Sequence, residues 1–383
     1  MKIVFSALPF YGHIFPLIPF AKAARNAGHD VLFATGADFD SVLRRAGLDP
    51  VAVGKPRLDV SLTTIDGLRV AGDDLTPEQA LARAGRVYGD DLPRQFVADL
   101  GPVLEDFKPD LLLHDPGNPG AGLAAELAGV PAMVHAYGRA PRGALTTAVE
   151  HYLAEYAAEL GVSLPAEYAS TLGNPTVDIC PPSLQRADFL ALGKRFALRP
   201  VAFAEADDVP PFVRHGGRLG YVTLGTIYGA VDLLRRVIDG LVRLGLRVLV
   251  ATGPSVDPAE LGELPASVSI ERWVPQAKLW PCVDVAVHHG GSGTMLGALA
   301  HGVRQLIVPQ AADQPTNART VAEAGAGLAL SPAEVTADAV AEKVNLIMTA
   351  DSFQEAAHRL RREIEQMPSP ADLAARLPDL LSR

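Results

Sequence analysis

The side chains best suited to chemistry in this sequence are an imidazole and a carboxylate that follow predicted strands. His13 comes after the apolar run KIVFSA at residues 2–7, and Asp115 closes the run PDLLLHD at residues 109–115. Imidazole titrates near neutral pH, so His13 could take a proton from a substrate while Asp115 fixes its tautomer and stabilises the imidazolium. The alternative for His13 is a residue at a helix N-terminus that faces a phosphate. We interpret the pair as a general base and its partner.

A second candidate site is the turn HHGGSGT at residues 288–294, which follows a β-branched apolar run. Its glycines allow positive φ or close approach of a ligand to the backbone. Ser292 is expected to cap the helix that begins there, so that the N–H groups of residues 293–295 point at an anion, with phosphate the natural candidate. His288 and His289 would lie at the carboxyl end of the strand, where open α/β sheets bind ligands. Either histidine taken alone could be structural, but the combination favours a ligand site.

Alternating strands and helices must position these residues. In the first half, the strand at 2–7 leads into a helix expected to start just after His13, with Pro16 and Pro19 in its first turn, and then into the strand DVLFATG. Because parallel strands share one carboxyl edge, His13 and Asp115 are expected to meet there. The first turn lacks GxGxxG and no acidic residue closes the second strand, which disfavours a dinucleotide site.

The second half repeats the alternating pattern, and a Pro- and Gly-rich stretch at 199–217 separates the halves. A chain of 383 residues is long enough for two domains. We predict a first domain at 1–205, a second at 206–367, and a C-terminal helix at 368–383 that packs back on the first domain.

Composition excludes several classes of function. The formal charge of −10, without a block of Lys or Arg, argues against a nucleic-acid partner. Cys180 and Cys282 have no zinc-like or disulfide-framework spacing, which fits a reducing cytoplasm. No apolar run is long enough for a membrane span, and prolines interrupt the apolar N-terminus, which disfavours a signal peptide. Asp38 and Asp40 form a D-x-D pattern used for metal–diphosphate binding elsewhere, but we interpret them as an exposed helix start and expect no metal.

Four motifs together resemble a known family. GHIFP at 12–16, WVPQ at 273–276, HHGGSGT at 288–294 and DQ at 313–314 occur in the order and near the spacing of the family 1 glycosyltransferases with the GT-B fold. The resemblance covers essentially the whole chain and is strongest to bacterial enzymes that glycosylate natural products. It implies an α/β fold of two Rossmann-like parallel-sheet domains facing a central cleft, and it matches His13 and Asp115 to the catalytic dyad of the family.

The resemblance also implies a donor site. Trp273 would lie against the base and Gln276 near the ribose, while His289 and the amides of the glycine turn would bind the diphosphate. Asp313 and Gln314 would hold sugar hydroxyls. Without the resemblance, Trp273 could be a core aromatic residue and residues 313–314 a solvated loop. The complete set of expected donor-binding residues is Gly12, Thr226, Trp273, Val274, Gln276, His289, Gly291, Ser292, Gly293, Thr294, Asp313 and Gln314.

One position departs from the family pattern. Many relatives have a glutamate eight residues after the phosphate-binding histidine, where it would hold the ribose hydroxyls, and here that position is Gly297. Its absence is compatible with a deoxynucleotide donor of the dTDP type or with a loss of donor affinity.

The function expected from these observations is inverting transfer of a sugar from a dTDP- or UDP-sugar to a hydrophobic natural product, with no cofactor. A nucleotide-sugar epimerase of the same fold and a non-catalytic binding relative remain alternatives, and a homodimer is possible. We expect the acceptor pocket in the irregular segments 54–95 and 138–180. Aromatic residues in or near these segments include Tyr88, Phe96, Tyr137, Tyr152 and Tyr156, although core packing explains several of them equally well.

Overall fold

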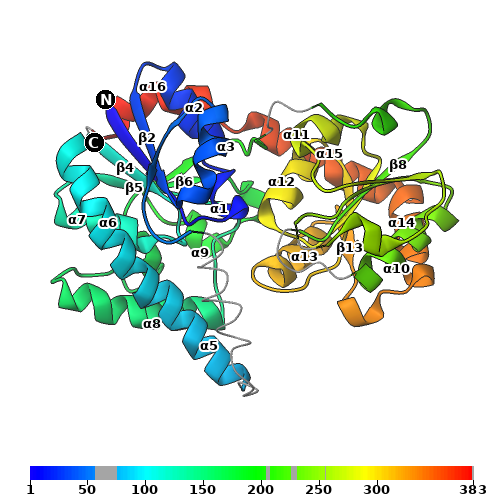
Figure 1. The fold of residues 1–383 in the computed structure, drawn as a ribbon, viewed down its shortest axis with the longest axis horizontal. Helices are drawn as coiled ribbons and strands as arrows, with labels where there is room; N and C mark the ends of the chain where they lie inside the picture. Colours follow the sequence, from blue (N-terminus) through cyan, green and yellow to red (C-terminus); the bar gives the residue numbers. More distant parts are fainter. Residues whose placement is uncertain (57–75, 204–207, 226–230, 255, 382–383) are drawn as a thin grey trace. The chain divides into compact units, whose positions relative to one another are not determined.

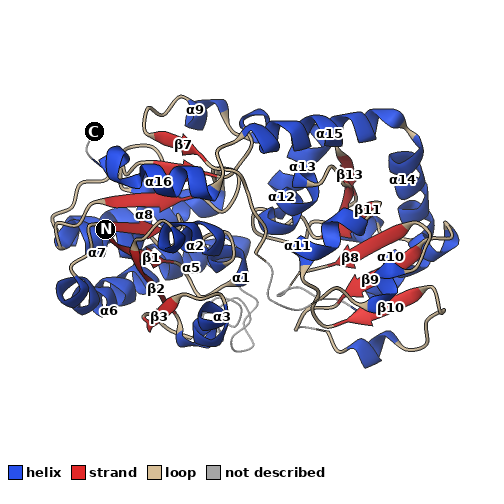
Figure 2. Cartoon of the chain, turned by 90° about the horizontal axis from the view of Figure 1, so that it is seen from above, coloured by secondary structure: helices blue, strands red, loops and turns tan. Residues whose placement is uncertain are grey.

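A computed structural model describes residues 1–56, 76–203, 208–225, 231–254 and 256–381 (Figure 1). The chain forms two compact units. The first contains Met1–Cys180, Gln185–Leu198 and Pro368–Arg383, and the second contains Pro181–Leu184 and Arg199–Met367. Within each unit, helices flank a parallel sheet (Figure 2). The predicted α/β class with two parallel-sheet domains is confirmed.

The first unit is built on a seven-stranded parallel sheet with the order β3-β2-β1-β4-β5-β6-β7. Its centre is formed by β1 and β4, which are apolar and almost completely buried, as is typical of strands covered on both faces. Ser6 is paired with His114, so β1 and β4 end side by side. The strands are β1 (Lys2–Ser6), β2 (Asp30–Thr35), β3 (Asp49–Ala52), β4 (Leu111–His114), β5 (Ala132–His135), β6 (Thr176–Asp178) and β7 (Arg195–Ala197).

Helices cover both faces of this sheet, and the last helix of the chain, α16, packs beside α2 (Figure 1). A hydrogen bond of 3.3 Å joins His29 Nε2 to the carbonyl oxygen of Ala374 at this contact. The helices are α1 (Tyr11–Ile14), α2 (Ile18–Asn26), α3 (Asp40–Arg45), α5 (Pro77–Arg86), α6 (Leu92–Phe107), α7 (Pro119–Leu127), α8 (Ala144–Glu159), α9 (Ala187–Leu190) and α16 (Pro370–Leu381).

Two expectations for the first unit were wrong. The N-terminal helix does not begin after His13: this residue lies inside the short helix α1, and α2 starts separately at Ile18, because Pro16 interrupts the hydrogen-bond ladder between them. The stretch 54–95 is more helical than expected in its described part, with α5 starting at a capping box formed by Thr76 and Gln79. Residues 57–75 lie outside the described residues. The strands β3, β6 and β7 were not predicted because their segments DPVA, TVD and RFA contain no continuous apolar run.

The second unit has a six-stranded parallel sheet with the order β10-β9-β8-β11-β12-β13. Its amphipathic helix α10 buries leucine, valine and isoleucine side chains against the sheet. The strands are β8 (Leu219–Thr223), β9 (Arg247–Ala251), β10 (Val268–Glu271), β11 (Val285–His288), β12 (Arg304–Ile307) and β13 (Gly327–Ala329). The helices are α10 (Val231–Arg243), α11 (Gln276–Leu279), α12 (Ser292–Ala300), α13 (Gln314–Glu323), α14 (Ala337–Thr349) and α15 (Asp351–Gln366). The sequence patterns did not identify α15. None of the described helices combines the length and the apolar character needed to cross a membrane.

Three histidines at the ends of central strands are completely buried. Desolvation lowers the pKa of His135 to about 4 and that of His288 to about 3, and it lowers the pKa of His114 as well. In the unfolded chain these side chains take up protons near the ordinary value of 6.5. Folding stability is therefore complete above that value and is lost as the pH falls towards 4 and 3, at about 1.4 kcal/mol per pH unit for each histidine.

We therefore expect the melting temperature of the native chain to fall steadily between pH 7 and pH 4. The melting temperature of the His135→Leu variant should fall less steeply over the same range. Neither ring nitrogen of His135 has a hydrogen-bond partner among the described residues, so an apolar substitute leaves no polar group unpaired. The measurement is a thermal melt of both proteins across this pH range. Equal slopes would show that His135 does not contribute to acid instability.

Candidate active site

The predicted contact between the imidazole and the carboxylate is present in the first unit. His13 Nδ1 lies 2.8 Å from Asp115 Oδ1. The side chain of His13 is 22% exposed, whereas that of Asp115 is fully buried. A carboxylate that is ionised can only accept a hydrogen bond, so Nδ1 carries the proton and Nε2 keeps its lone pair. The exposed side of the ring is therefore the basic one.

The Asp115 carboxylate is held by backbone groups that the strand ends supply. Its Oδ2 accepts from the N–H of Leu8 at 3.0 Å, and its Oδ1 accepts from the N–H of Gly117 at 2.6 Å. A Cβ at Gly117 would lie 2.6 Å from His13 Cε1, so only glycine fits beside the pair. The need for glycine at position 117 was not recognised from the sequence, because it depends on packing between segments about 100 residues apart. Gly12, predicted in the donor site, lies in α1, and a Cβ there would meet nothing within 4 Å.

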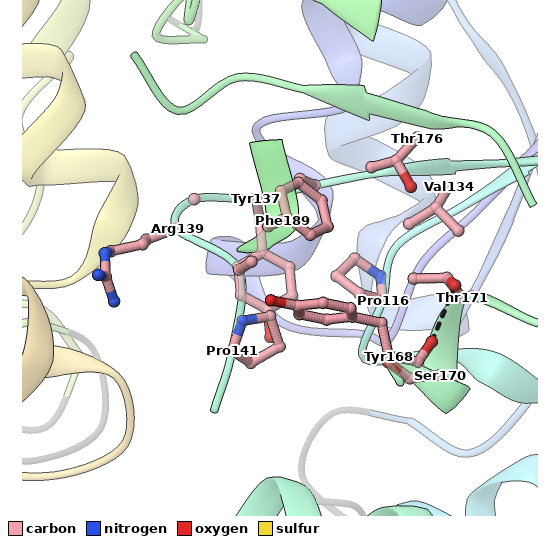
Figure 3. Close-up of a pocket in the computed structure, with 13 residues that line it drawn as sticks. Pro116, Val134, Tyr137, Arg139, Pro141, Tyr168, Ser170, Thr171, Thr176 and Phe189 are labelled. Carbon is pink, nitrogen blue, oxygen red and sulfur yellow. Dashed lines mark hydrogen bonds between the residues drawn. The ribbon is translucent and has the colours of Figure 1, made fainter. Parts of the chain in front are cut away.

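A small cavity lies in the first unit (Figure 3). The ring of Tyr137 lines the cavity and lies 4.7 Å from the ring of His13 between centroids. Tyr168 and Phe189 form further aromatic walls, with their centroids 5.1 Å apart. The volume is about 20 Å³, room for about one water molecule. The cavity can therefore take only a small group or the edge of a ring.

Most of the aromatic residues expected near an acceptor do not line this cavity. Phe96 and Tyr156 are buried in apolar clusters, and Tyr88 packs against one of them. Tyr152 lies on α8 and does not line the cavity either. Tyr137 is the one residue of the expected set that does.

In the second unit, the glycine turn leads from β11 into α12 as predicted, but Ser292 is not its cap. The N-cap is Gly291, and Ser292 is the first helical residue. The Ser292 hydroxyl instead donates to Asp313 Oδ2 at 2.7 Å. The first-turn N–H groups at Gly293 and Thr294 therefore have no side-chain cap at this helix, and a Cβ at Gly293 would meet nothing within 4 Å.

His289 is packed between two glycines. A Cβ would lie 2.9 Å from His289 Nε2 if placed at Gly225 and 2.4 Å if placed at Gly291. Burial lowers the pKa of His289, so the ring is neutral at pH 7 and carries one N–H. Its Nδ1 is buried and has no hydrogen-bond partner within the described part of the chain. Gly225 was missed from the sequence, since it lies after β8, far from the motif that it supports.

The neighbouring His288 does not belong to this site. It is fully buried, and its Nε2 lies 2.7 Å from Oε1 of Gln305 on the adjacent strand β12. Its Nδ1 accepts from the N–H of Gly290. His288 ends β11 at the carboxyl edge of the sheet, as predicted. Its ring lies in the interior rather than at a ligand site, because successive strand residues face opposite sides.

The residues expected near the base and ribose differ in exposure. The side chain of Trp273 is 39% exposed, whereas that of Val274 is 3% exposed and packs in an apolar cluster. Gln276 donates to the Tyr221 hydroxyl at 3.0 Å and accepts from Thr294 at 3.4 Å. Trp273 is thus partly accessible to solvent, while Val274 is not.

The space beside Gly297 is closed. A Cβ there would lie 2.6 Å from the indole nitrogen of Trp280, which is itself buried. The glutamate found in many relatives therefore has no room at this position. Thr226, expected near the phosphates, lies outside the described residues.

The DQ motif lies where a loop meets α13: Asp313 is the N-cap and Gln314 is the first helical residue. Gln314 is buried, and its Oε1 accepts from the N–H groups of Gln310 and Ala311 at 2.8 and 3.1 Å. Asp313 Oδ2 accepts from Ser292 and from Asn317 Nδ2 at 2.8 Å. Gln314 thus stabilises the loop that contains Gln310 and Ala311. Asn317 is a further residue of this site that the sequence motifs did not reveal.

Two family models match the chain. The one described as Erythromycin biosynthesis protein CIII-like, N-terminal domain, matches residues 22–197, and its C-terminal counterpart matches residues 235–380. The L-demethylnoviosyl transferase of Streptomyces niveus is 34% identical over 382 residues, which cover 98% of this chain and 97% of that protein. The elloramycin glycosyltransferase of Streptomyces olivaceus is 32% identical over 400 residues, with the same coverage of 98% and 97%.

Solved structures agree with these relatives. The glycosyltransferase SsfS6 of Streptomyces sp. SF2575, complexed with thymidine diphosphate, has a TM-score of 0.80 at 28% identity and covers 99% of each chain. The calicheamicin glycosyltransferase CalG4 has a TM-score of 0.83 at 22% identity over 100% of this chain and 98% of its own, which shows a shared fold. Together with the models that match both halves, these similarities show that the chain belongs to the bacterial natural-product glycosyltransferases of family 1, which have the GT-B fold.

Proposed function

We propose that this glycosyltransferase inverts the configuration at the anomeric carbon of its donor sugar and uses His13 as its general base. The observation that supports the proposal best is the 2.8 Å contact between His13 Nδ1 and the buried Asp115. It leaves Nε2 as the basic nitrogen on the exposed side of the ring. A positioned general base with a fixed tautomer typically contributes about 10²–10⁴-fold to a rate.

In the proposed step, His13 Nε2 takes the proton of the acceptor hydroxyl as its oxygen attacks the anomeric carbon. The attack comes from the face opposite the diphosphate. The bond between the anomeric carbon and the diphosphate oxygen breaks, the configuration inverts, and the nucleoside diphosphate leaves. Asp115 stabilises the imidazolium through the hydrogen bond to Nδ1.

The leaving diphosphate would be bound by His289 and the first turn of α12. The uncapped N–H groups there and the positive end of the helix dipole favour an anion. A neutral, buried imidazole adds one N–H donor without a competing charge. These fixed dipoles supply the charge stabilisation that a divalent cation provides in other phosphate sites, so we expect no metal requirement.

The donor nucleotide is proposed to be dTDP rather than UDP. Gly297 has no side chain to bind a ribose 2′-hydroxyl, and Trp280 fills the space beside it. The thymidine diphosphate in the SsfS6 structure supports this choice.

The acceptor is proposed to be a hydrophobic natural product that contacts the cavity beside His13. Aromatic walls from Tyr137, Tyr168 and Phe189 suit an apolar ring edge or a methyl group. Ser170, Thr171 and Thr176 are further residues that line the same cavity.

The test is a thermal-shift titration with dTDP and UDP, followed by a transfer assay with a dTDP-sugar and a panel of hydrophobic acceptors. A ligand at a hundred times its Kd raises stability by about 2.7 kcal/mol, so dTDP should raise the melting temperature by several degrees. Incubation with the donor alone tests the epimerase alternative. An altered sugar without any acceptor would contradict the proposal, as would retention of the anomeric configuration in the product.

Tyr137→Ala should lower kcat/KM for the acceptor and leave KM for the donor unchanged. Loss of a buried aromatic contact is worth about 1.5–3 kcal/mol, which corresponds to about tenfold to hundredfold in kcat/KM. Tyr152→Ala, an aromatic change in the same unit that does not line the cavity, is the control. Equal acceptor kinetics in both variants would exclude the cavity from acceptor binding.

A further inference from the structure

We propose that Asn317 is a positioning residue that fixes the Asp313 carboxylate against the glycine turn and thereby joins the sugar-binding and diphosphate-binding parts of the donor site. The inference rests on the proposed function, because it assumes that the donor binds at this turn. It concerns a residue outside the sequence motifs that first indicated the site.

The amide of Asn317 makes three contacts in the interior of the second unit. Its Nδ2 lies 2.9 Å from the carbonyl oxygen of Gly290, 3.1 Å from Ser292 Oγ and 2.8 Å from Asp313 Oδ2. The side chain is 1% exposed. These three acceptors belong to two separate segments, the glycine turn and the loop before α13. One buried amide therefore holds both segments in a fixed relation.

The contacts also restrict the Asp313 carboxylate. Its Oδ2 accepts from both Asn317 and the Ser292 hydroxyl, which lies 2.7 Å away. The two hydrogen bonds to Oδ2 select a single rotamer of the Asp313 side chain. The other oxygen, Oδ1, therefore remains to bind a sugar hydroxyl. Hydrogen bonds to an ionised group are about twice as strong as neutral ones, so this arrangement is rigid.

The loop that carries Asp313 needs such support. Ala312 has φ of 56°, in the left-handed region that side chains other than glycine rarely adopt. Such a conformation persists only where the surroundings impose it. Gln314 supports the loop from one end through Gln310 and Ala311, and Asn317 supports it from the other through Asp313.

Asparagine suits this place chemically. The amide nitrogen has two protons to donate and no charge, which matches acceptors that include a carboxylate and a carbonyl. An aspartate would place a second carboxylate beside Asp313, and an alanine would leave the buried Gly290 carbonyl and the carboxylate without this donor.

The first test compares Asn317→Ala with the native chain in titration calorimetry, with dTDP and dTDP-glucose as probes. Loss of a hydrogen bond to a charged group costs about 1.5–3 kcal/mol, so the affinity for dTDP-glucose should fall by about tenfold to a hundredfold or more. Affinity for dTDP should fall less, by about twofold to tenfold, since only the neutral contacts of Asn317 to Gly290 and Ser292 in the turn affect it. Thr320→Ala is the control, because Thr320 is a buried polar residue of the same helix whose hydroxyl donates to the carbonyl of Thr316 in that helix.

The second test uses Asn317→Asp at different pH values. Two carboxylates in contact share a proton as the pH falls, because proximity raises one pKa, and the protonated group becomes a donor again. The affinity of this variant for dTDP-glucose, divided by that of the native chain, should therefore rise from pH 8 to pH 5. A role limited to fold stability would lower the melting temperature without such a rise.

Equal losses of affinity for dTDP and dTDP-glucose in Asn317→Ala would overturn the proposal, as would a pH-independent ratio for Asn317→Asp. A native chain that binds dTDP-glucose no more tightly than dTDP would overturn it too, since Asp313 would then not bind the sugar. Failure of the native chain to bind either ligand would instead refute the proposed function.

Discussion

His13→Ala is expected to lower the rate of sugar transfer by about 10²–10⁴-fold, the usual contribution of a general base, while the affinity for dTDP stays unchanged. The imidazole lies in the first unit, and the groups proposed to bind diphosphate lie in the second. Removal of the base therefore acts on the chemical step. Single-turnover transfer kinetics and dTDP calorimetry measure the two quantities separately.

Two further variants show whether the His13 effect is specific. Asp115→Asn preserves the shape of the side chain, but its amide can also donate, so the proton of His13 need no longer lie on Nδ1. In the Ser-His-Asp triad, where an aspartate fixes the histidine tautomer in the same way, the corresponding change lowers kcat by about 10⁴-fold. His151→Ala removes an exposed histidine of α8 and should leave the rate at the native value. Native turnover in His13→Ala would remove the residue from the mechanism. A parallel loss of dTDP affinity would instead assign it to the donor site.

His289→Ala is expected to have the second largest effect, with a fall in kcat of about 10²–10³-fold as for the loss of one donor to a developing oxyanion. The ring lies between Gly225 and Gly291, and it is neutral because burial lowers its pKa. A neutral donor binds the leaving diphosphate more strongly as charge accumulates on it. The affinity for dTDP should fall as well, in contrast to His13→Ala.

The control for His289 is His215→Ala, an exposed histidine of the same unit. Gly291→Ala should reproduce part of the loss without any change of the imidazole, because its Cβ would lie 2.4 Å from Nε2 and displace the ring. If His289→Ala binds dTDP as tightly as the native chain, the diphosphate does not lie against this histidine.

Under the proposed function, acceptor specificity is expected to depend on different residues than donor binding does. The strained Tyr168, with φ of 54°, is held by Arg186, which donates to its hydroxyl at 3.2 Å. Because side chains rarely adopt such a conformation, it indicates that the surrounding loop fixes this cavity wall. Changes in acceptor choice are therefore expected from residues near 137 and 168 rather than from the glycine turn.

Much of the fold was predictable because its signals are local. Buried parallel strands appear as short apolar runs, and the glycine turn and the DQ motif lie within about 30 residues of each other. The pairing of His13 with Asp115 could be expected because β1 and β4 end at the same edge of a sheet. The strands β3, β6 and β7 were missed because their segments contain no continuous apolar run. The helix α15 was missed because a largely polar helix resembles a loop in a pattern of hydrophobicity.

The sequence alone determined the α/β class, the two parallel sheets, the family and the position of the candidate base, because each depends on residues that are close in the chain or joined by regular strand geometry. Only the tertiary structure decided which side chains are actually presented. It shows that the ring of His288 lies in the interior and that Ser292 donates to Asp313 instead of capping a helix. It also shows that Trp280 fills the space beside Gly297 and that Asn317 contacts the glycine turn and Asp313. Those outcomes depend on contacts between segments that are distant in the chain, and the local pattern of a sequence does not specify which distant residues come into contact.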